Sequence, residues 1–259
     1  MDNTVLELKN ITQAYGKHVV VKDLSIKLER GQIGCLLGAS GCGKTTVMRT
    51  IAGFEPLLKG EILLNGELVS NSDWRLPPAK RKVGMVFQDY ALFPHMTIFD
   101  NIAFGLNDLE SSEKIIRVNE VLELVGLTGT RNKYPHEISG GQQQRIALAR
   151  ALAPRPELLL MDEPFSNLDV TLRERLSMEV REILKEYGAT ALFVTHNQHE
   201  AFTVADEVGV MFDGHMLQWD IPHEIYHRPT CCYVADFVGE GVLLKGVVKD
   251  GQTVETGLT

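Results

Sequence analysis

The segment 38–45, which reads Gly-Ala-Ser-Gly-Cys-Gly-Lys-Thr, constrains the fold of this chain more than any other feature. An apolar run at 33–37 precedes it and is typical of a buried strand, and residues 45–52 are expected to form a helix. Glycines permit the tight curl in which successive backbone N–H groups surround phosphates, and the helix N-terminus adds a favourable dipole. A G-x-x-x-x-G-K-[ST] segment between a strand and a helix therefore predicts a phosphate loop rather than a chance glycine-rich turn.

A second apolar run, 158–161, ends in two carboxylates, Asp162 and Glu163. Ligands of open α/β sheets bind at the carboxyl ends of the strands, where these side chains would lie. A lone Asp-Glu pair at a strand end is usually only solvated. Beside a phosphate loop, we expect Asp162 to hold Mg²⁺ through water and Glu163 to polarise an attacking water.

The order of the expected elements indicates an α/β fold. Residues 5–28 alternate and predict short antiparallel strands, whereas later buried strands at 33–37, 158–161 and 190–194 alternate with helices, as in a parallel sheet. The stretch from about 100 to 153 has helical periodicity and reads as an inserted helical subdomain. Residues 168–187 predict a long charged helix, and 208–218 a hairpin.

Composition excludes several classes of protein. The chain has 259 residues, 44% hydrophobic content and a net charge of -8, without the basic footprint of a nucleic-acid-binding protein. Its first residues do not resemble a signal peptide, and no apolar run approaches the about 18 residues of a membrane span. The four cysteines show no metal-binding spacing, and we expect free thiols in a reducing cytosol.

The segment 138–142, Ile-Ser-Gly-Gly-Gln, decides between families of phosphate-loop proteins. Ser139 is expected to cap a helix whose first N–H groups stay accessible because glycines follow, which makes a second anion site. With this segment the sequence resembles an ABC ATPase, whose signature motif matches residues 139–142. In that family the signature contacts the γ-phosphate of the ATP that the partner subunit holds.

Other elements of the ABC ATPase family occur in order, and the resemblance covers about residues 5 to 240. It implies that Tyr15 stacks on adenine, that Gln88 senses Mg²⁺ and water, and that Asp169 in the D-loop 166–169 crosses a dimer interface. His196, after the strand 193–195, resembles the switch histidine that hydrogen-bonds the γ-phosphate. Each of these residues alone would more often be structural.

The resemblance thus predicts an ABC-type phosphate-loop NTPase with a parallel core sheet, an N-terminal antiparallel β subdomain and an inserted helical subdomain at about 89–155. The expected catalytic residues are Glu163 and His196. The expected nucleotide contacts are Tyr15, Gly38, Ala39, Ser40, Gly41, Cys42, Gly43, Lys44, Thr45 and Thr46. Those made in trans are Ser139, Gly140, Gly141, Gln142 and Asp169, and the Mg²⁺ site comprises Thr45, Gln88 and Asp162.

A narrower resemblance concerns the segments 90–97, 135–145 and 165–169, which look like importers of the maltose, polyamine and ferric-iron type. Residues 237–242 look most like the ferric-iron group. Such subunits usually carry a further β-barrel regulatory region. We therefore expect an ATPase domain over 1–238 and the start of a truncated C-terminal β region over 239–259.

As a whole, the resemblance implies an ATP-hydrolysing subunit of a bacterial importer, peripheral at the cytoplasmic face of the inner membrane. The implied partners are a second ATPase subunit, membrane permease subunits docking near 90–96 and, indirectly, a periplasmic solute-binding protein, with no nucleic acid. Sugar or polyamine import remains open, as does a non-transport ATPase. The about fifty residues between Gln88 and Ser139 leave no room for the coiled coils of DNA-repair ATPases, and a ribosome-associated ATPase would carry two heads.

Overall fold

The computed structural model describes residues 3–239, 241, 246–250 and 253–256. Its central element is a six-stranded sheet of order β10-β9-β3-β8-β7-β6, in which five strands are parallel and the edge strand β10 is antiparallel to β9. The strands are β3 (Ile33–Gly38), β6 (Val83–Val86), β7 (Leu158–Asp162), β8 (Ala191–Thr195), β9 (Glu207–Phe212) and β10 (His215–Asp220). The expected parallel core and the 208–218 hairpin are confirmed.

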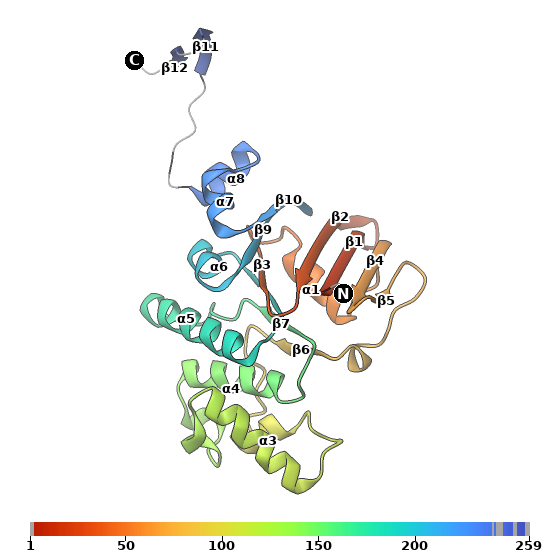
Figure 1. The fold of residues 1–259 in the computed structure, drawn as a ribbon, viewed down its shortest axis with the longest axis vertical. Coiled ribbons are helices and arrows are strands. Elements are labelled where there is room, and N and C mark those ends of the chain that lie inside the picture. Colours follow the sequence, from red (N-terminus) through yellow and green to blue (C-terminus); the bar gives the residue numbers. More distant parts are fainter. Residues whose placement is uncertain (1–2, 240, 242–245, 251–252, 257–259) are drawn as a thin grey trace.

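An antiparallel sheet of order β2-β1-β4-β5 lies beside the core sheet (Figure 1). It comprises β1 (Thr4–Tyr15), β2 (His18–Glu29), β4 (Lys59–Leu64) and β5 (Glu67–Ser70). The expectation of short strands in the first thirty residues is wrong, because β1 and β2 are twelve residues each. Asn10 and Asp23 adopt positive φ at register shifts, so the strands bend without ending.

The helices divide between the core sheet and a separate helical region (Figure 1). The helices α5 (Val170–Tyr187) and α6 (Gln198–Val204) lie along the core sheet, and α1 (Lys44–Ala52) follows β3. The inserted region contains α2 (Ile98–Ala103), α3 (Ser111–Leu124) and α4 (Gly140–Leu152), with short 3₁₀ turns at Thr128–Thr130 and Pro135–Glu137; another turn lies at Pro78–Lys80. The helices α7 (Pro222–His227) and α8 (Cys232–Val238) follow β10.

Both faces of the core strands are buried, which explains their continuous apolar runs. In β3, Cys35 and Leu37 face a cluster that includes α4, α5 and the helical region, whereas Leu36 faces the cluster of α1 and the N-terminal sheet. The same alternation occurs in β8, where Phe193 and Leu192 lie on opposite faces. The sheet thus forms the shared wall of two cores, and its strand tips carry the candidate site.

Residues 246–256 contain a two-stranded antiparallel hairpin of β11 (Gly246–Asp250) and β12 (Thr253–Thr256). The expected C-terminal β region over 239–259 includes residues 242–245, 251–252 and 257–259, which lie outside the described part of the chain. Residues 240 and 242, which belong to the 237–242 segment, also lie outside it. The division into domains at residue 238 stays a prediction.

Candidate functional site

The phosphate loop joins β3 to α1 at the carboxyl end of the core sheet. Gly41 and Gly43 have φ values of 83° and 106°, which side-chain-bearing residues rarely adopt. A Cβ on Gly43 would also lie 3.0 Å from the Val20 carbonyl oxygen of β2. The loop therefore curls as the glycine spacing predicts, and its backbone approaches the neighbouring sheet closely.

Lys44 begins α1 and is 5% exposed. Its ammonium donates to the carbonyl oxygens of Gly38 at 2.7 Å and Ala39 at 2.9 Å, and it lies 3.8 Å from the Cys42 sulfur. These bonds hold the positive charge across the curl of the loop. The lysine thus occupies a position from which it can contact an anion that the loop surrounds.

Thr45 and Asp162 come together from α1 and the tip of β7. The Thr45 hydroxyl donates to Asp162 Oδ1 over 3.2 Å. Burial raises the pKa of Asp162, although the hydrogen bond from Thr45 opposes the shift. Mg²⁺ prefers oxygen ligands and is usually held by one or two protein oxygens plus substrate phosphates, so this pair beside a phosphate loop fits that ion. Gln88, the third expected metal ligand, is exposed and makes no side-chain hydrogen bond to this pair within the described chain.

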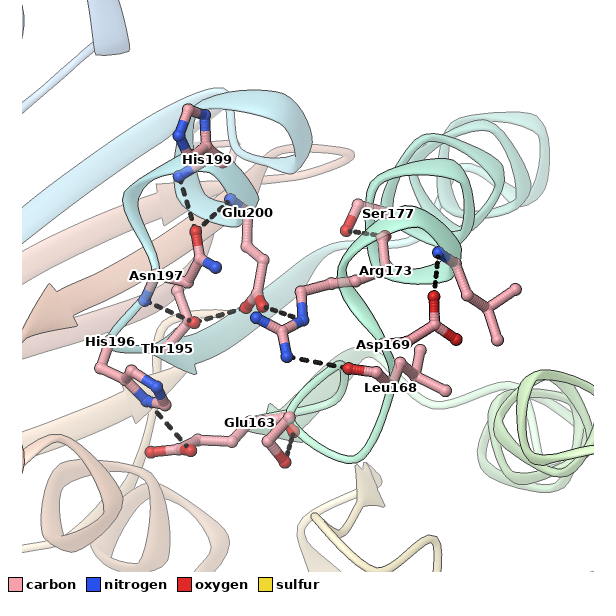
Figure 2. Close-up of polar contacts among 12 residues, drawn as sticks. Glu163, Leu168, Asp169, Arg173, Ser177, Thr195, His196, Asn197, His199 and Glu200 are labelled. Carbon is pink, nitrogen blue, oxygen red and sulfur yellow. Dashed lines mark hydrogen bonds and ion pairs between the residues drawn. The ribbon is translucent and has the colours of Figure 1, made fainter.

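Glu163 and His196 lie side by side at the ends of two adjacent strands, β7 and β8. His196 Nδ1 is 3.2 Å from Glu163 Oε2, as Figure 2 shows. Glu163 adopts φ 42°, and its backbone N–H donates to the Val194 carbonyl over 3.1 Å. The positive φ is unusual for a non-glycine residue and places this carboxylate at a bend immediately after the strand.

The phosphate loop and the Glu163 carboxylate line the same hollow, which has a volume of about 180 Å³. Glu163 shares the lining with residues of β2, the loop and α1, namely Val20, Ser40, Gly41, Gly43, Lys44, Thr45 and Thr46. A larger hollow of about 440 Å³ lies in the helical region, where its lining includes Asp108, Glu113 and Glu120. The same lining holds Arg117 and Arg155, both at ion-pair distance from Glu120, but it includes no part of the phosphate loop, so size alone does not identify the site.

The signature residues begin α4, in the helical region. The Ser139 hydroxyl accepts from the Gln142 N–H over 3.3 Å, and the Gln142 side chain accepts from the Ser139 N–H over 3.0 Å. This reciprocal capping box confirms the expected cap. Ser139 and Gly140 are exposed, and no hydrogen bond within the described chain joins residues 139–142 to the phosphate loop.

The remaining site residues lie on loops around the strand tips. Asn167 donates from its side chain to the Gln88 carbonyl over 2.8 Å, which links the D-loop 166–169 to the segment after β6. Asp169 is exposed and caps α5 by accepting from the Leu172 N–H over 3.0 Å. Tyr15, at the end of β1, is 45% exposed and thus available for stacking.

The loop after β6 is fixed by two polar side chains from the helical region. Arg150 donates to the carbonyl oxygens of Tyr90 and Ala91 over 2.7 and 2.6 Å. The buried Asn101 accepts from the Phe93 N–H and donates to the Phe93, Met96 and Thr97 carbonyls. Leu92, Phe93 and Met96 are consequently half-buried rather than freely exposed.

Sequence reasoning missed three polar residues that lie behind His196. Thr195, Glu200 and Arg173 connect β8, α6 and α5 through a short hydrogen bond from Thr195 to Glu200 and a longer ion pair between Glu200 and Arg173 (Figure 2). Glu200 is 5% exposed although it lies in a short helix that the sequence alone makes look solvated. No spacing rule flags a glutamate four residues after a histidine, and only the packing of α6 against α5 reveals its burial.

The family model and proteins similar in sequence agree on one kind of relative, the ATP-binding proteins of transport systems. The sequence model of the family described as ABC transporter matches residues 21–166. The Fe(3+) ions import ATP-binding protein FbpC of Pasteurella multocida is 46% identical over 258 residues, which span 99% of this chain and 73% of that protein. The putrescine transport ATP-binding protein PotG of Escherichia coli is 47% identical over 256 residues, 98% of this chain and 66% of that protein.

Among solved structures, cbiO1 from Clostridium perfringens, part of the ABC transporter complex cbiONQ, is similar with a TM-score of 0.80. The two chains are 27% identical, and the match covers 86% of this chain and 91% of that one. None of the described helices is both long and apolar enough to span a membrane.

Proposed function

This chain belongs to the ABC transporter family of ATP-hydrolysing proteins, and from that premise we propose that it powers a bacterial importer. It would act as a peripheral subunit at the cytoplasmic face of the inner membrane, bound to permease subunits that receive solute from a periplasmic binding protein. Two of its curated relatives carry import or transport in their names and cover nearly all of this chain.

In the proposed site, one chain supplies the residues that bind the ATP and orient the attacking water. The loop 38–46 and Lys44 bind the phosphates, and Tyr15 stacks on adenine. Thr45 and Asp162, with Gln88, would hold Mg²⁺, which would neutralise phosphate charge. Glu163 orients the attacking water, and His196, 3.2 Å from it, hydrogen-bonds the γ-phosphate.

The second half comes from a partner copy, and the exposed start of α4 is the observation that carries this proposal. The first N–H groups of a helix have no acceptor within it. The capping box satisfies the N–H groups of Gln142 and Ser139, and Gly140, the first helical residue, is exposed whereas Gly141 is buried, so the Gly140 N–H is the one open to an external anion. Because none of the described residues 139–142 lines the phosphate-loop hollow of its own chain, we assign residues 139–142 and Asp169 to the ATP of the other copy.

The first test is Glu163→Gln, which keeps the shape of the side chain but cannot act as a base. We expect unchanged ATP binding, a loss of hydrolysis of about a hundredfold or more, and an ATP-dependent dimer on size exclusion. Glu174→Gln, at an exposed position of α5, serves as the matched control and should hydrolyse ATP normally. Wild-type turnover by Glu163→Gln would refute the assignment.

A second test separates the cis and trans roles. Lys44→Ala should lose ATP affinity, whereas Ser139→Arg should retain ATP binding and lose hydrolysis. Mixing the two variants should restore one competent site, at well below full activity. Loss of nucleotide binding by isolated Ser139→Arg would contradict the trans role.

For the permease contact, we propose the loop 90–96 together with the neighbouring Phe104. Phe104 is 53% exposed and packs against Phe93 with a ring separation of 4.6 Å, so apolar surface remains available beside the fixed loop. Phe104→Asp should reduce co-purification with the permease without lowering ATP binding. Met178→Asp is the matched control because Met178 on α5 is equally exposed.

For the solute, we propose ferric iron, with polyamine import as the second candidate. The ferric-iron relative and the putrescine relative are 46% and 47% identical to this chain, which favours neither. The similarity of 237–242 to ferric-iron importers is the reason for the first choice. Deleting the gene should reduce uptake of labelled ferric iron, and a Glu163→Gln copy should fail to restore it. Loss of putrescine uptake with normal iron uptake would select the second candidate.

A further inference from the structure

A buried carboxylate, Glu200, lies between the strand end that carries His196 and the start of helix α5 (Figure 2). One of its oxygens accepts from the Thr195 hydroxyl over 2.5 Å. The other lies 3.6 Å from Arg173 Nε, at ion-pair distance. Since both oxygens face protein groups, this carboxylate does not act on water or nucleotide itself.

The first side of this contact chain fixes the backbone around His196. Thr195 donates to Glu200 and accepts from the Asn197 N–H over 3.0 Å, so one hydroxyl ties the residues before and after the histidine. The Asn197 side chain in turn caps α6 by accepting from the His199 and Glu200 N–H groups. The direction of the His196 ring toward Glu163 therefore depends on where Glu200 holds Thr195.

The opposite side of the chain reaches the D-loop. Arg173 Nη2 donates to the Leu168 carbonyl over 2.9 Å, directly before Asp169. A cavity of about 110 Å³ lies beside the pair, between α5 and α6. The ion pair thus joins the two helices directly at the edge of this cavity.

We propose that Glu200 and Arg173 are positioning residues that fix the position of the switch histidine His196 relative to the D-loop 166–169. This inference rests on the roles proposed above for His196 and Asp169. A shift of α5, which carries the D-loop, would be transmitted through Leu168, Arg173 and Glu200 to Thr195, and so to the histidine beside the attacking water. Misplacing a catalytic group by about 1 Å can cost a hundredfold in rate, so a short chain of contacts can control hydrolysis.

The alternative is that the pair only holds α5 and α6 together, and the chain provides a matched control for it. Arg181, two turns further along α5, also binds a carboxylate, Asp206, over 2.9 Å and a backbone carbonyl, that of Val204. Arg181 joins α5 to the end of α6 in the same manner but at the side away from His196. A purely structural role predicts the same effects from losing either arginine.

The experiment compares Arg173→Met and Arg181→Met in the full-length chain, by steady-state ATP hydrolysis, ATP binding and thermal unfolding. We expect Arg173→Met to lower kcat at least tenfold with KM for ATP within about twofold, since the phosphate loop is untouched. Arg173→Lys, which retains a cation, should recover part of this loss. Arg181→Met should lower the unfolding midpoint while kcat stays within about twofold of wild type.

The proposal is overturned by an unchanged kcat for Arg173→Met, and equally by an equal loss of kcat for both arginine variants. If Arg173→Met does not fold, the double variant Arg173→Met, Glu200→Gln leaves no unpaired buried charge and is measured in its place. His196→Ala separates the hypotheses. If it hydrolyses ATP normally, the proposed site itself fails. If it is inactive while the double variant retains wild-type kcat, the site stands and the positioning role alone is refuted.

Discussion

Arg81 provides the sharpest stability prediction, because a single buried guanidinium joins the phosphate-loop helix to the N-terminal sheet. Arg81 is 3% exposed, and all five of its N–H groups donate hydrogen bonds. The acceptors are the carbonyls of Thr50 and Ile51 in the last turn of α1, those of Val69 and Leu76, and the Ser70 hydroxyl, at 2.6 to 3.2 Å.

The magnitude follows from two opposing contributions. Hydrogen bonds from a charged group contribute about 1.5 kcal/mol each, so the five together stabilise the fold by about 7 kcal/mol. Burial, helped by the nearby Arg75 charge, lowers the pKa of Arg81 to about 10. A shift of that size corresponds to a burial cost of about 3 kcal/mol. The balance predicts that Arg81→Met lowers the free energy of unfolding by about 4 kcal/mol.

Urea titration followed by circular dichroism measures this difference. Arg75→Met is the control, because the Arg75 side chain is exposed and, among the described residues, donates one weak hydrogen bond, to the Phe54 carbonyl over 3.3 Å. That variant should change the free energy of unfolding by less than about 0.5 kcal/mol. If Arg81→Met costs less than about 1 kcal/mol, the five bonds do not outweigh the burial of the charge and the reasoning fails.

Two further predictions concern other contacts around the site. Gly214→Ala should cost at least about 2 kcal/mol and weaken ATP binding, because its Cβ would lie 2.3 Å from a β2 carbonyl and its N–H donates to the phosphate loop. Gly16→Ala, with similar φ and open space around it, should cost about 1 kcal/mol in the same titration, and equal costs would contradict the steric argument. Burial raises the pKa of Asp206, but hydrogen bonds from Lys185, a backbone N–H and Arg181 outweigh it and lower that pKa overall. Its contribution to stability is therefore complete above the unfolded-state pKa and lost as the pH falls below about 4, so Asp206→Asn should destabilise the chain at pH 7 and lessen its acid sensitivity; an unchanged pH profile would refute this.

Local sequence patterns were sufficient to predict the functional residues at the ends of the core strands. The phosphate loop could be placed because Lys44 and Thr45 follow an apolar run at a fixed spacing, and Asp162 and Glu163 end another such run. The cap at Ser139 was predictable for the same reason, since capping depends on residues three apart. In each case the residues that define the feature are neighbours in sequence.

Features that depend on distant contacts were not predictable in this way. The strand β4 pairs with β1, and β5 pairs with β4, and nothing within residues 59–70 indicates that β1 is the partner. Arg81 lies in a cationic run, Lys80-Arg81-Lys82, which reads as a solvated loop. Glu200 likewise reads as an exposed helical residue. Their burial follows from how elements far apart in sequence pack, which the local pattern does not encode.

Backbone strain at the candidate site occurs in the segments that follow the neighbouring strands β6 and β7. Tyr90, Ala91 and Glu163 have φ values of 62°, 47° and 42°, a conformation that costs about 1 kcal/mol or more per residue. Such residues persist only where the surroundings hold them. Arg150 of α4 binds the first two carbonyls, and Glu163 is bonded through its N–H to β8 and through its carbonyl to Ser166. The direction of the Glu163 carboxylate is therefore set by contacts from β8 and the D-loop, which explains how residues behind the strand tips can determine the geometry of the hydrolytic site.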